Sequence, residues 1–310
     1  MQSKIVILGT GGTMAGTAAS ATDGVGYSAA QLGVAQLVAA MPPLDGMPIE
    51  CEQVAQLDSK DMDFATWQRL AQRAAFHLAR ADVAGVVVTH GTDTLEETAY
   101  FLHRVLAPQK PLVLTAAMRP ATSLQADGPQ NLFDAVTLAR DGRVHGVSVV
   151  IAGRAWAAAD VRKRHTYRLD AFDGGDAGPL ALIEEGQVRV LRTHEDDGNA
   201  IGLDAIARDT TSWPRVEIVL NHAGASGALV DALVVQQVDG IVAAGTGNGT
   251  LSASLEAALR HAASSGVRVL RASRCAVGPV QGGDAEGLPS AGTLTAVHGR
   301  VELKLQLLAG

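Results

Sequence analysis

Short runs of apolar, mostly β-branched residues recur along this chain with helical patterns between them. Four of these runs are typical of buried parallel strands: Lys4–Leu8, Val83–Thr89, Pro111–Thr115 and Val147–Ile151. Apolar residues at three- and four-residue spacing predict helices over 67–78 and 95–106, and Pro129 fits the first turn of a third helix. Because strand and helix alternate, the sequence predicts an α/β fold with a mainly parallel sheet.

The alternation thins in the polar, turn-prone stretch 194–199 and resumes at Val216–Leu220. A strand over 240–244, a helix over 251–263 and a strand over 267–271 then predict a second, smaller α/β unit. We therefore predict a larger N-terminal domain over 1–193, a linker over 194–213 and a smaller C-terminal α/β domain over 214–310.

Composition and charge exclude several classes of protein. Of the 310 residues, 47% are hydrophobic and 18% charged, which is enough apolar surface for a globular core. A net charge of −7 gives no electrostatic reason to bind nucleic acid or an anionic membrane. The start of the chain lacks the pattern of a secretory leader, and Cys51 and Cys275 lack metal-ligand spacing. We expect a cytoplasmic protein with no metal and no disulfide.

The loop after the first predicted strand, Gly9–Gly16, is rich in glycine and threonine. Such a loop lets the backbone approach a ligand closely and leaves hydroxyl groups at the carboxyl end of the strand. A dinucleotide fingerprint would require glycine at position 14, where Met14 stands, so we expect no nicotinamide cofactor. Taken alone, Thr13 could equally bond to nearby backbone in a structural role.

A second polar loop, Thr89–Glu97, follows the strand predicted over 83–89. It places Thr92 and Asp93 side by side at the carboxyl end of that strand, where ligands bind in open α/β sheets. The same residues could form a helix N-cap, with Thr92 or Asp93 as cap and Glu96 or Glu97 completing a capping box. A catalytic loop and a helix cap are compatible.

The two loops together resemble the paired signatures of the bacterial-type L-asparaginase family, which includes glutaminase-asparaginases. The resembling segments are Thr10–Gly16 and His90–Thr94, and further similar blocks occur at 59–62, 96–102, 117–120, 126–132, 160–163, 178–180, 245–249 and 284–286. The resemblance implies a large N-terminal and a small C-terminal α/β domain. It also implies hydrolysis of the side-chain amide of L-asparagine through a threonine acyl-enzyme, without a cofactor, in a homotetramer built from close dimers.

The resemblance also assigns roles to particular residues. Thr13 matches the nucleophile, and Tyr27 matches a tyrosine that approaches it from a mobile loop. Thr92, Asp93 and Lys163 match a second catalytic cluster that activates the attacking hydroxyl or water. Substrate-binding positions are matched by Ser59 for the α-carboxylate, by Asp93 and a neighbouring subunit's Glu286 for the α-ammonium, and by Lys60, Thr92, Ala117 and Thr250 around them.

Departures from the family pattern concern specificity. Lys60 stands where many members have glutamine, and Thr250 where asparagine or serine is frequent; the stretch before Glu286 is one residue longer. The alternatives are a glutaminase-asparaginase or a D-amino-acid amide hydrolase of the same fold. A non-catalytic amino-acid-binding protein is a third alternative, against which the full set of matched catalytic residues argues.

Overall fold

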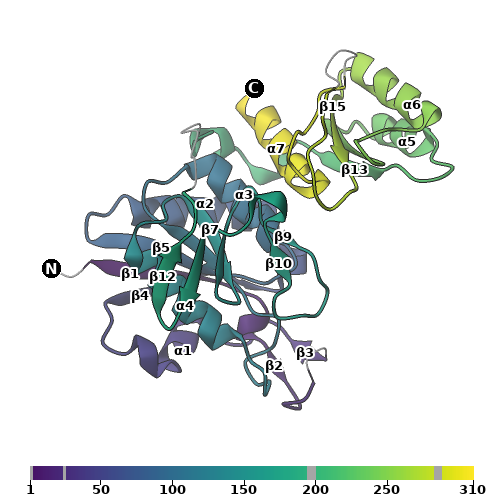
Figure 1. Cartoon of the computed structure of the whole chain (residues 1–310). Helices are drawn as coiled ribbons and strands as arrows, with labels where there is room; N and C mark the ends of the chain where they lie inside the picture. The colour runs from purple at the N-terminus through teal and green to yellow at the C-terminus, as the bar shows by residue number, and fades with distance from the viewer. Residues whose placement is uncertain (1–2, 24–25, 194–199, 283–287) are drawn as a thin grey trace. The chain divides into compact units, whose positions relative to one another are not determined.

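The computed structural model describes residues 3–23, 26–193, 200–282 and 288–310. The chain divides into two compact units, Met1–Leu203 and Asp204–Gly310 (Figure 1). Residues 194–199 of the predicted linker lie outside the described residues.

An eight-stranded sheet forms the centre of the first unit, in the order β12-β11-β8-β7-β6-β5-β1-β4. Its parallel part consists of β1 (Lys4–Gly11), β4 (Ile49–Leu57), β5 (Val83–Thr89), β6 (Leu112–Thr115) and β7 (Val147–Ile151). Antiparallel pairing adds β8 (Arg154–Ala157), β11 (Ala181–Glu184) and β12 (Gln187–Val190). The prediction of a mainly parallel sheet is confirmed, whereas the antiparallel extension was not predicted.

Helices of the first unit pack their apolar stripes on this sheet. They are α1 (Val34–Ala39), α2 (Phe64–Leu78), α3 (Leu95–Leu106) and α4 (Gly128–Asp141). In α2, the side chain of Asp63 caps the first turn by accepting a hydrogen bond from the Thr66 amide, and Trp67 and Leu70 are buried. In α4, Pro129 stands in the first turn as predicted, and Gly142 ends the helix in the left-handed region with φ 74°.

The predicted capping box at the start of α3 is wrong. Its N-cap residue is Thr94, which makes no side-chain capping bond. Thr92 and Asp93 precede the cap, and the Glu96 carboxylate bonds to the backbone of a distant strand instead. This leaves the side chains of the second polar loop available for other contacts.

Smaller elements carry two of the predicted site residues. The short antiparallel pair β2 (Thr17–Ala18) and β3 (Tyr27–Ser28) holds Tyr27, and the pair β9 (Arg162–Lys163) and β10 (Phe172–Asp173) holds Lys163. Single 3₁₀ turns occur at Thr13–Ala15, Pro42–Leu44, Ser59–Asp61, Gly175–Ala177, Asp204–Ile206 and Thr210–Ser212.

The second unit has its own sheet and core. Its parallel strands, in the order β13-β14-β15, are β13 (Val216–Leu220), β14 (Gly240–Gly245) and β15 (Arg268–Ser273). The helices are α5 (Ala228–Val235), α6 (Ala253–Ser264) and α7 (Ala296–Ala309), of which α5 and α7 were not predicted. Within the described ranges, no helix is long and apolar enough to span a membrane.

Candidate active site

Two glycine-containing loops meet at the carboxyl ends of β1 and β5. Gly12 adopts φ 80°, and a Cβ built on it would lie 2.5 Å from the backbone of Gly91. A Cβ on Gly91 would in turn lie 2.4 Å from Ser59 Oγ. Only glycine fits at both positions, because a side chain on either would overlap the neighbouring loop. The missing side chains therefore allow the loops that carry Thr13, Thr92 and Ser59 to lie against one another.

Thr13 starts a 3₁₀ turn directly after this glycine contact. Its side chain is buried, and its Oγ1 lies 2.7 Å from the Oη of Tyr27. Tyr27 reaches it from β3, which pairs with β2 so that Ala18 lies opposite Tyr27. The structure thus brings together the two residues of the first predicted cluster, with the phenol placed to exchange a proton with the threonine hydroxyl.

Thr92, Lys163 and Asp93 form a second hydrogen-bonded cluster. The Lys163 ammonium donates to Thr92 Oγ1 at 2.9 Å and to Asp93 Oδ1 at 2.6 Å. Thr92 is buried, whereas the Asp93 side chain is half exposed. Thr92 and Asp93 lie in the loop after β5, and Lys163 lies in β9. Because Asp93 and Lys163 are 70 positions apart in the sequence, tertiary packing brings the cluster together. An amine bonded to a hydroxyl can serve proton transfer to or from that hydroxyl.

Glu96 holds the strand that carries Lys163. Its Oε2 accepts a hydrogen bond of 2.7 Å from the Lys163 backbone amide. Burial is the main cause that raises the pKa of Glu96 to about 7; the neighbouring Glu97 raises it further, while the Lys163 amide, Arg162 and the Lys163 ammonium oppose the rise. From the sequence we expected Glu96 or Glu97 to complete a helix cap. The local pattern does not reveal that Glu96 bonds to Lys163, which is 67 positions away.

Ser59 joins the same loops from the end of β4. Its buried Oγ accepts a hydrogen bond of 3.1 Å from the Asp93 amide, and its carbonyl accepts one of 2.7 Å from the Thr94 hydroxyl. The adjacent Lys60 is placed differently. Its ammonium bonds to Asp58 at 2.7 Å and Asp61 at 3.1 Å, and its side chain is 61% exposed.

A buried network behind the second loop fixes its backbone. His90 Nδ1 lies 2.7 Å from the Gly91 carbonyl and Nε2 lies 3.0 Å from Thr98 Oγ1, which also accepts from Trp67 Nε1 at 2.8 Å. Because a carbonyl can only accept, the network assigns the proton to Nδ1. Burial lowers the pKa of His90 to about 4, so the ring is neutral at neutral pH. Sequence reasoning did not identify this support.

The remaining predicted residues lie elsewhere. Ala117 is fully buried just after β6, where a Cβ on Gly128 would lie 3.5 Å from its methyl group. Thr250 belongs to the second unit, and its hydroxyl lies 2.9 Å from that of Thr246 across a tight turn. Glu286 lies outside the described residues.

The described members of the two clusters carry hydroxyl, phenol, amine and carboxylate groups. Among the described residues, no group of three or more His, Cys, Asp or Glu side chains is arranged to hold a metal ion. A buried hydroxyl beside a phenol, and a second hydroxyl bonded to an amine, are groups that acyl transfer at a carbonyl carbon can use.

Comparison with known proteins gives matches along both units. The family model "Asparaginase, N-terminal" matches residues 4–196, and "Glutaminase/Asparaginase C-terminal domain" matches residues 215–310. Together these models cover more than half of the chain.

Individual relatives cover nearly the full length. L-asparaginase 2 of Escherichia coli (strain K12) is 40% identical over 313 residues, which cover 98% of this chain and 88% of the relative. Glutaminase-asparaginase of Pseudomonas fluorescens biotype A is 37% identical, covering 89% of this chain and 76% of the relative. The crystal structure of probable cytoplasmic L-asparaginase from Campylobacter jejuni superimposes with a TM-score of 0.92 at 37% identity, covering 99% of this chain and 95% of that one.

Proposed function

Because this chain belongs to the asparaginase family, we propose that it hydrolyses L-asparagine to L-aspartate and ammonia through a threonine ester. The observation that carries the proposal is the pairing of two hydroxyl clusters on touching loops, Thr13 with Tyr27 and Thr92 with Lys163.

In the first half-reaction, Thr13 Oγ1 attacks the amide carbon of the substrate. The hydroxyl proton passes to the Tyr27 oxygen, which lies 2.7 Å away, as the phenolic proton moves to the departing nitrogen. The C–N bond breaks, ammonia leaves and the aspartyl group remains on Thr13 as an ester. Backbone amides of the glycine-rich loops are suited to stabilise the negative charge that develops on the carbonyl oxygen.

In the second half-reaction, water hydrolyses the ester. With Lys163 as the neutral amine, the water proton would pass to Thr92 Oγ1 as the Thr92 hydroxyl proton passes to Lys163 Nζ, 2.9 Å away, and Asp93 would hold the resulting ammonium. This ammonium then supplies the proton that Thr13 takes up when the ester breaks. The ester bond breaks, Thr13 regains its proton and L-aspartate leaves. Ser59 would bind the α-carboxylate of the substrate, and Asp93 with Glu286 its α-ammonium. The chemistry needs no cofactor.

Glutamine is the second candidate substrate. A relative 37% identical to this chain is named glutaminase-asparaginase, which supports activity on the longer amide. The ratio of kcat/KM for the two amides decides between them, and a clear preference for L-glutamine would overturn the asparagine assignment.

An ammonia-release assay tests the mechanism. We expect Thr13→Ala and Thr92→Val each to reduce turnover by at least a thousandfold, with unchanged circular dichroism and unfolding midpoint. Thr137→Val is a matched control, since this hydroxyl donates to the Phe133 carbonyl at 2.8 Å within α4 and is not one of the proposed site residues. Substantial ammonia release by both site variants would refute the mechanism.

We also propose that the active unit is a homotetramer in which Glu286 of one subunit completes the site of another. Exposed apolar side chains on β13 and α5, among them Leu220 and Leu229, offer contact surface for a further copy. Light scattering should give about four times 32.0 kDa. Co-assembled Thr13→Ala and Glu286→Gln chains should recover activity that neither variant has alone; no recovery would refute shared sites.

A cytoplasmic location is the remaining part of the proposal. The Campylobacter jejuni relative is named a probable cytoplasmic L-asparaginase, which supports this location, whereas a Haemophilus influenzae relative is named a probable periplasmic enzyme. Fractionation of cells that express the full chain distinguishes the two compartments.

A further inference from the structure

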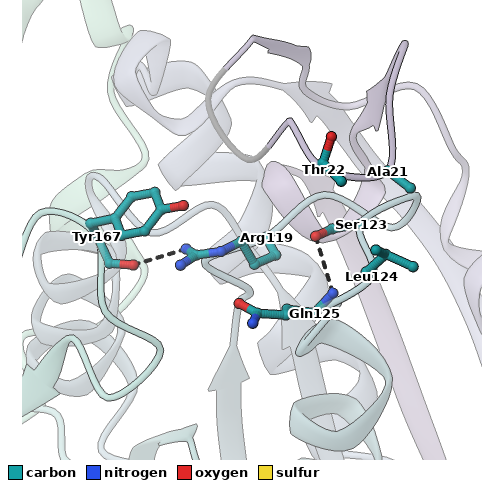
Figure 2. A pocket seen from close by; sticks show the side chains of 7 residues that line it. All are labelled: Ala21, Thr22, Arg119, Ser123, Leu124, Gln125 and Tyr167. Atoms are coloured by element: carbon teal, nitrogen blue, oxygen red, sulfur yellow. Dashed lines mark hydrogen bonds between the residues drawn. The ribbon is translucent and has the colours of Figure 1, made fainter.

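A small cavity beside β2 is lined by residues that the proposed mechanism does not use. It has a volume of about 230 Å³ and is lined by Ala21, Thr22, Arg119, Ser123, Leu124, Gln125 and Tyr167. Figure 2 shows Arg119 in the middle of this group, with Tyr167 on one side and Ser123 on the other. We refer to it as the Arg119 cavity.

Arg119 is a buried cation whose hydrogen-bond partners are neutral. Its side chain is 6% exposed, its Nη1 donates to the carbonyls of Met118 and Tyr167, and its guanidinium lies 3.9 Å from the centre of the Tyr167 ring. No carboxylate of the described residues lies within 4 Å of it, and Nε and Nη2 have no hydrogen-bond partner among those residues. The nearby Asp127 attracts it, but the Asp127 oxygens accept the backbone amides of Met118 and Arg119.

The other polar groups of the cavity, like Arg119, are suited to contact a negatively charged ligand. Thr22 and Ser123 supply hydroxyls, Gln125 supplies an amide, and none of the described residues that line the cavity is acidic. Planar guanidinium groups bind carboxylates through two parallel hydrogen bonds. We propose that the Arg119 cavity binds a small carboxylate anion, which is separate from the asparagine substrate of the proposed function.

The walls of the cavity are connected to Tyr27. The Ala18 amide donates to Thr122 Oγ1 at 2.9 Å, and the Leu124 amide donates to the Ala21 carbonyl at 3.0 Å. Ala18 pairs directly with Tyr27 across the β2–β3 sheet. A carboxylate that bridges Arg119 and Thr22 would therefore hold β2 against residues 119–125 and stabilise the position of the Tyr27 phenol. Only this link to activity rests on the proposed function.

Calorimetric titration of the full-length protein with malonate tests the site. We expect Gln125→Glu, which adds one negative charge to the lining without touching Arg119, to weaken malonate binding at least tenfold. Gln125→Asn is the matched control and should bind within about threefold of the unaltered protein. Ser59→Ala identifies malonate that binds in the proposed active site instead. Hydrogen exchange of the Ala18 and Leu124 amides should slow at least threefold when malonate is bound.

Three results would overturn the proposal: no binding up to 50 mM malonate, binding lost in Ser59→Ala but kept in Gln125→Glu, or binding of inorganic phosphate but not malonate at this cavity. Because binding is measured directly, these results do not depend on whether the protein releases ammonia. If the unaltered protein binds malonate but does not release ammonia from L-asparagine, the proposed function is refuted and the malonate site is not.

Discussion

Replacing Glu96 with glutamine should change how the stability of this protein depends on pH. Burial raises the pKa of Glu96 from 4.5 to about 7 in the folded chain. Below pH 4.5 the carboxyl group is protonated in both the folded and the unfolded state, so burial carries no charge penalty. Above pH 7 it is ionised in both states, and the folded state carries the full cost. The contribution of Glu96 to stability therefore falls as pH rises from about 4.5 to about 7.

The magnitude follows from the raised pKa. One pKa unit corresponds to about 1.4 kcal/mol, so the ionised carboxylate reduces the free energy of unfolding by at most about 3 kcal/mol above pH 7. Glutamine at position 96 carries no charge, and its Oε1 can still accept the Lys163 amide hydrogen bond that Glu96 accepts at 2.7 Å. We therefore expect the free energy of unfolding of Glu96→Gln, relative to that of the unaltered protein, to increase by about 1–3 kcal/mol as the pH is raised from 5 to 8.

Urea unfolding followed by tryptophan fluorescence, at a fixed protein concentration and at pH 5, 6, 7 and 8, measures this difference. Glu184→Gln is the control for loss of one carboxylate, because the Glu184 side chain is 59% exposed and pairs with Arg189 on the surface. Its stability difference should vary by less than about 0.5 kcal/mol over the same range. If the curves for Glu96→Gln and the unaltered protein run parallel with pH, the burial argument is refuted.

Three further substitutions test other parts of the site. Gly12→Ala should lower the free energy of unfolding by at least about 2 kcal/mol, because the methyl group would lie 2.5 Å from the Gly91 backbone. The control Gly46→Ala has a similar φ but open space around it and should lower the free energy of unfolding by about 1 kcal/mol. Equal losses for the two variants in urea unfolding would contradict the close approach at Gly12. Lys60→Gln should change the free energy of unfolding by less than about 1 kcal/mol and the KM for L-asparagine by less than threefold, because the Lys60 ammonium pairs with surface carboxylates. A tenfold change in KM would show that Lys60 contacts the substrate. Thr98→Val should cost about 1–3 kcal/mol, because it leaves His90 Nε2 without its donor, and thermal unfolding at pH 7 that matches the unaltered protein would contradict this role.

Local patterns were sufficient to predict most of the buried parallel strands. The runs at 83–89 and 147–151 are apolar throughout because both faces of their strands are covered, and the structure has β5 and β7 at these positions. Strand β4 was not predicted, since it lies at the edge of the sheet and its alternating residues Glu50 and Glu52 remain partly exposed. The antiparallel strands β8, β11 and β12 have only four residues each and give a weak periodic signal.

The sequence by itself determined the fold class, the family and the identity of the main candidate residues, because these depend on local hydrophobic periodicity and on contiguous motifs such as Thr10–Gly16 and His90–Thr94. Only the tertiary structure decided what those residues contact. The Lys60 ammonium pairs with Asp58 and Asp61. The Glu96 carboxylate accepts the Lys163 backbone amide, whereas the sequence predicted that it would complete a helix cap. The physical reason is that hydrogen bonds and desolvation act between groups close in space, and sheet packing brings together residues that no local pattern connects.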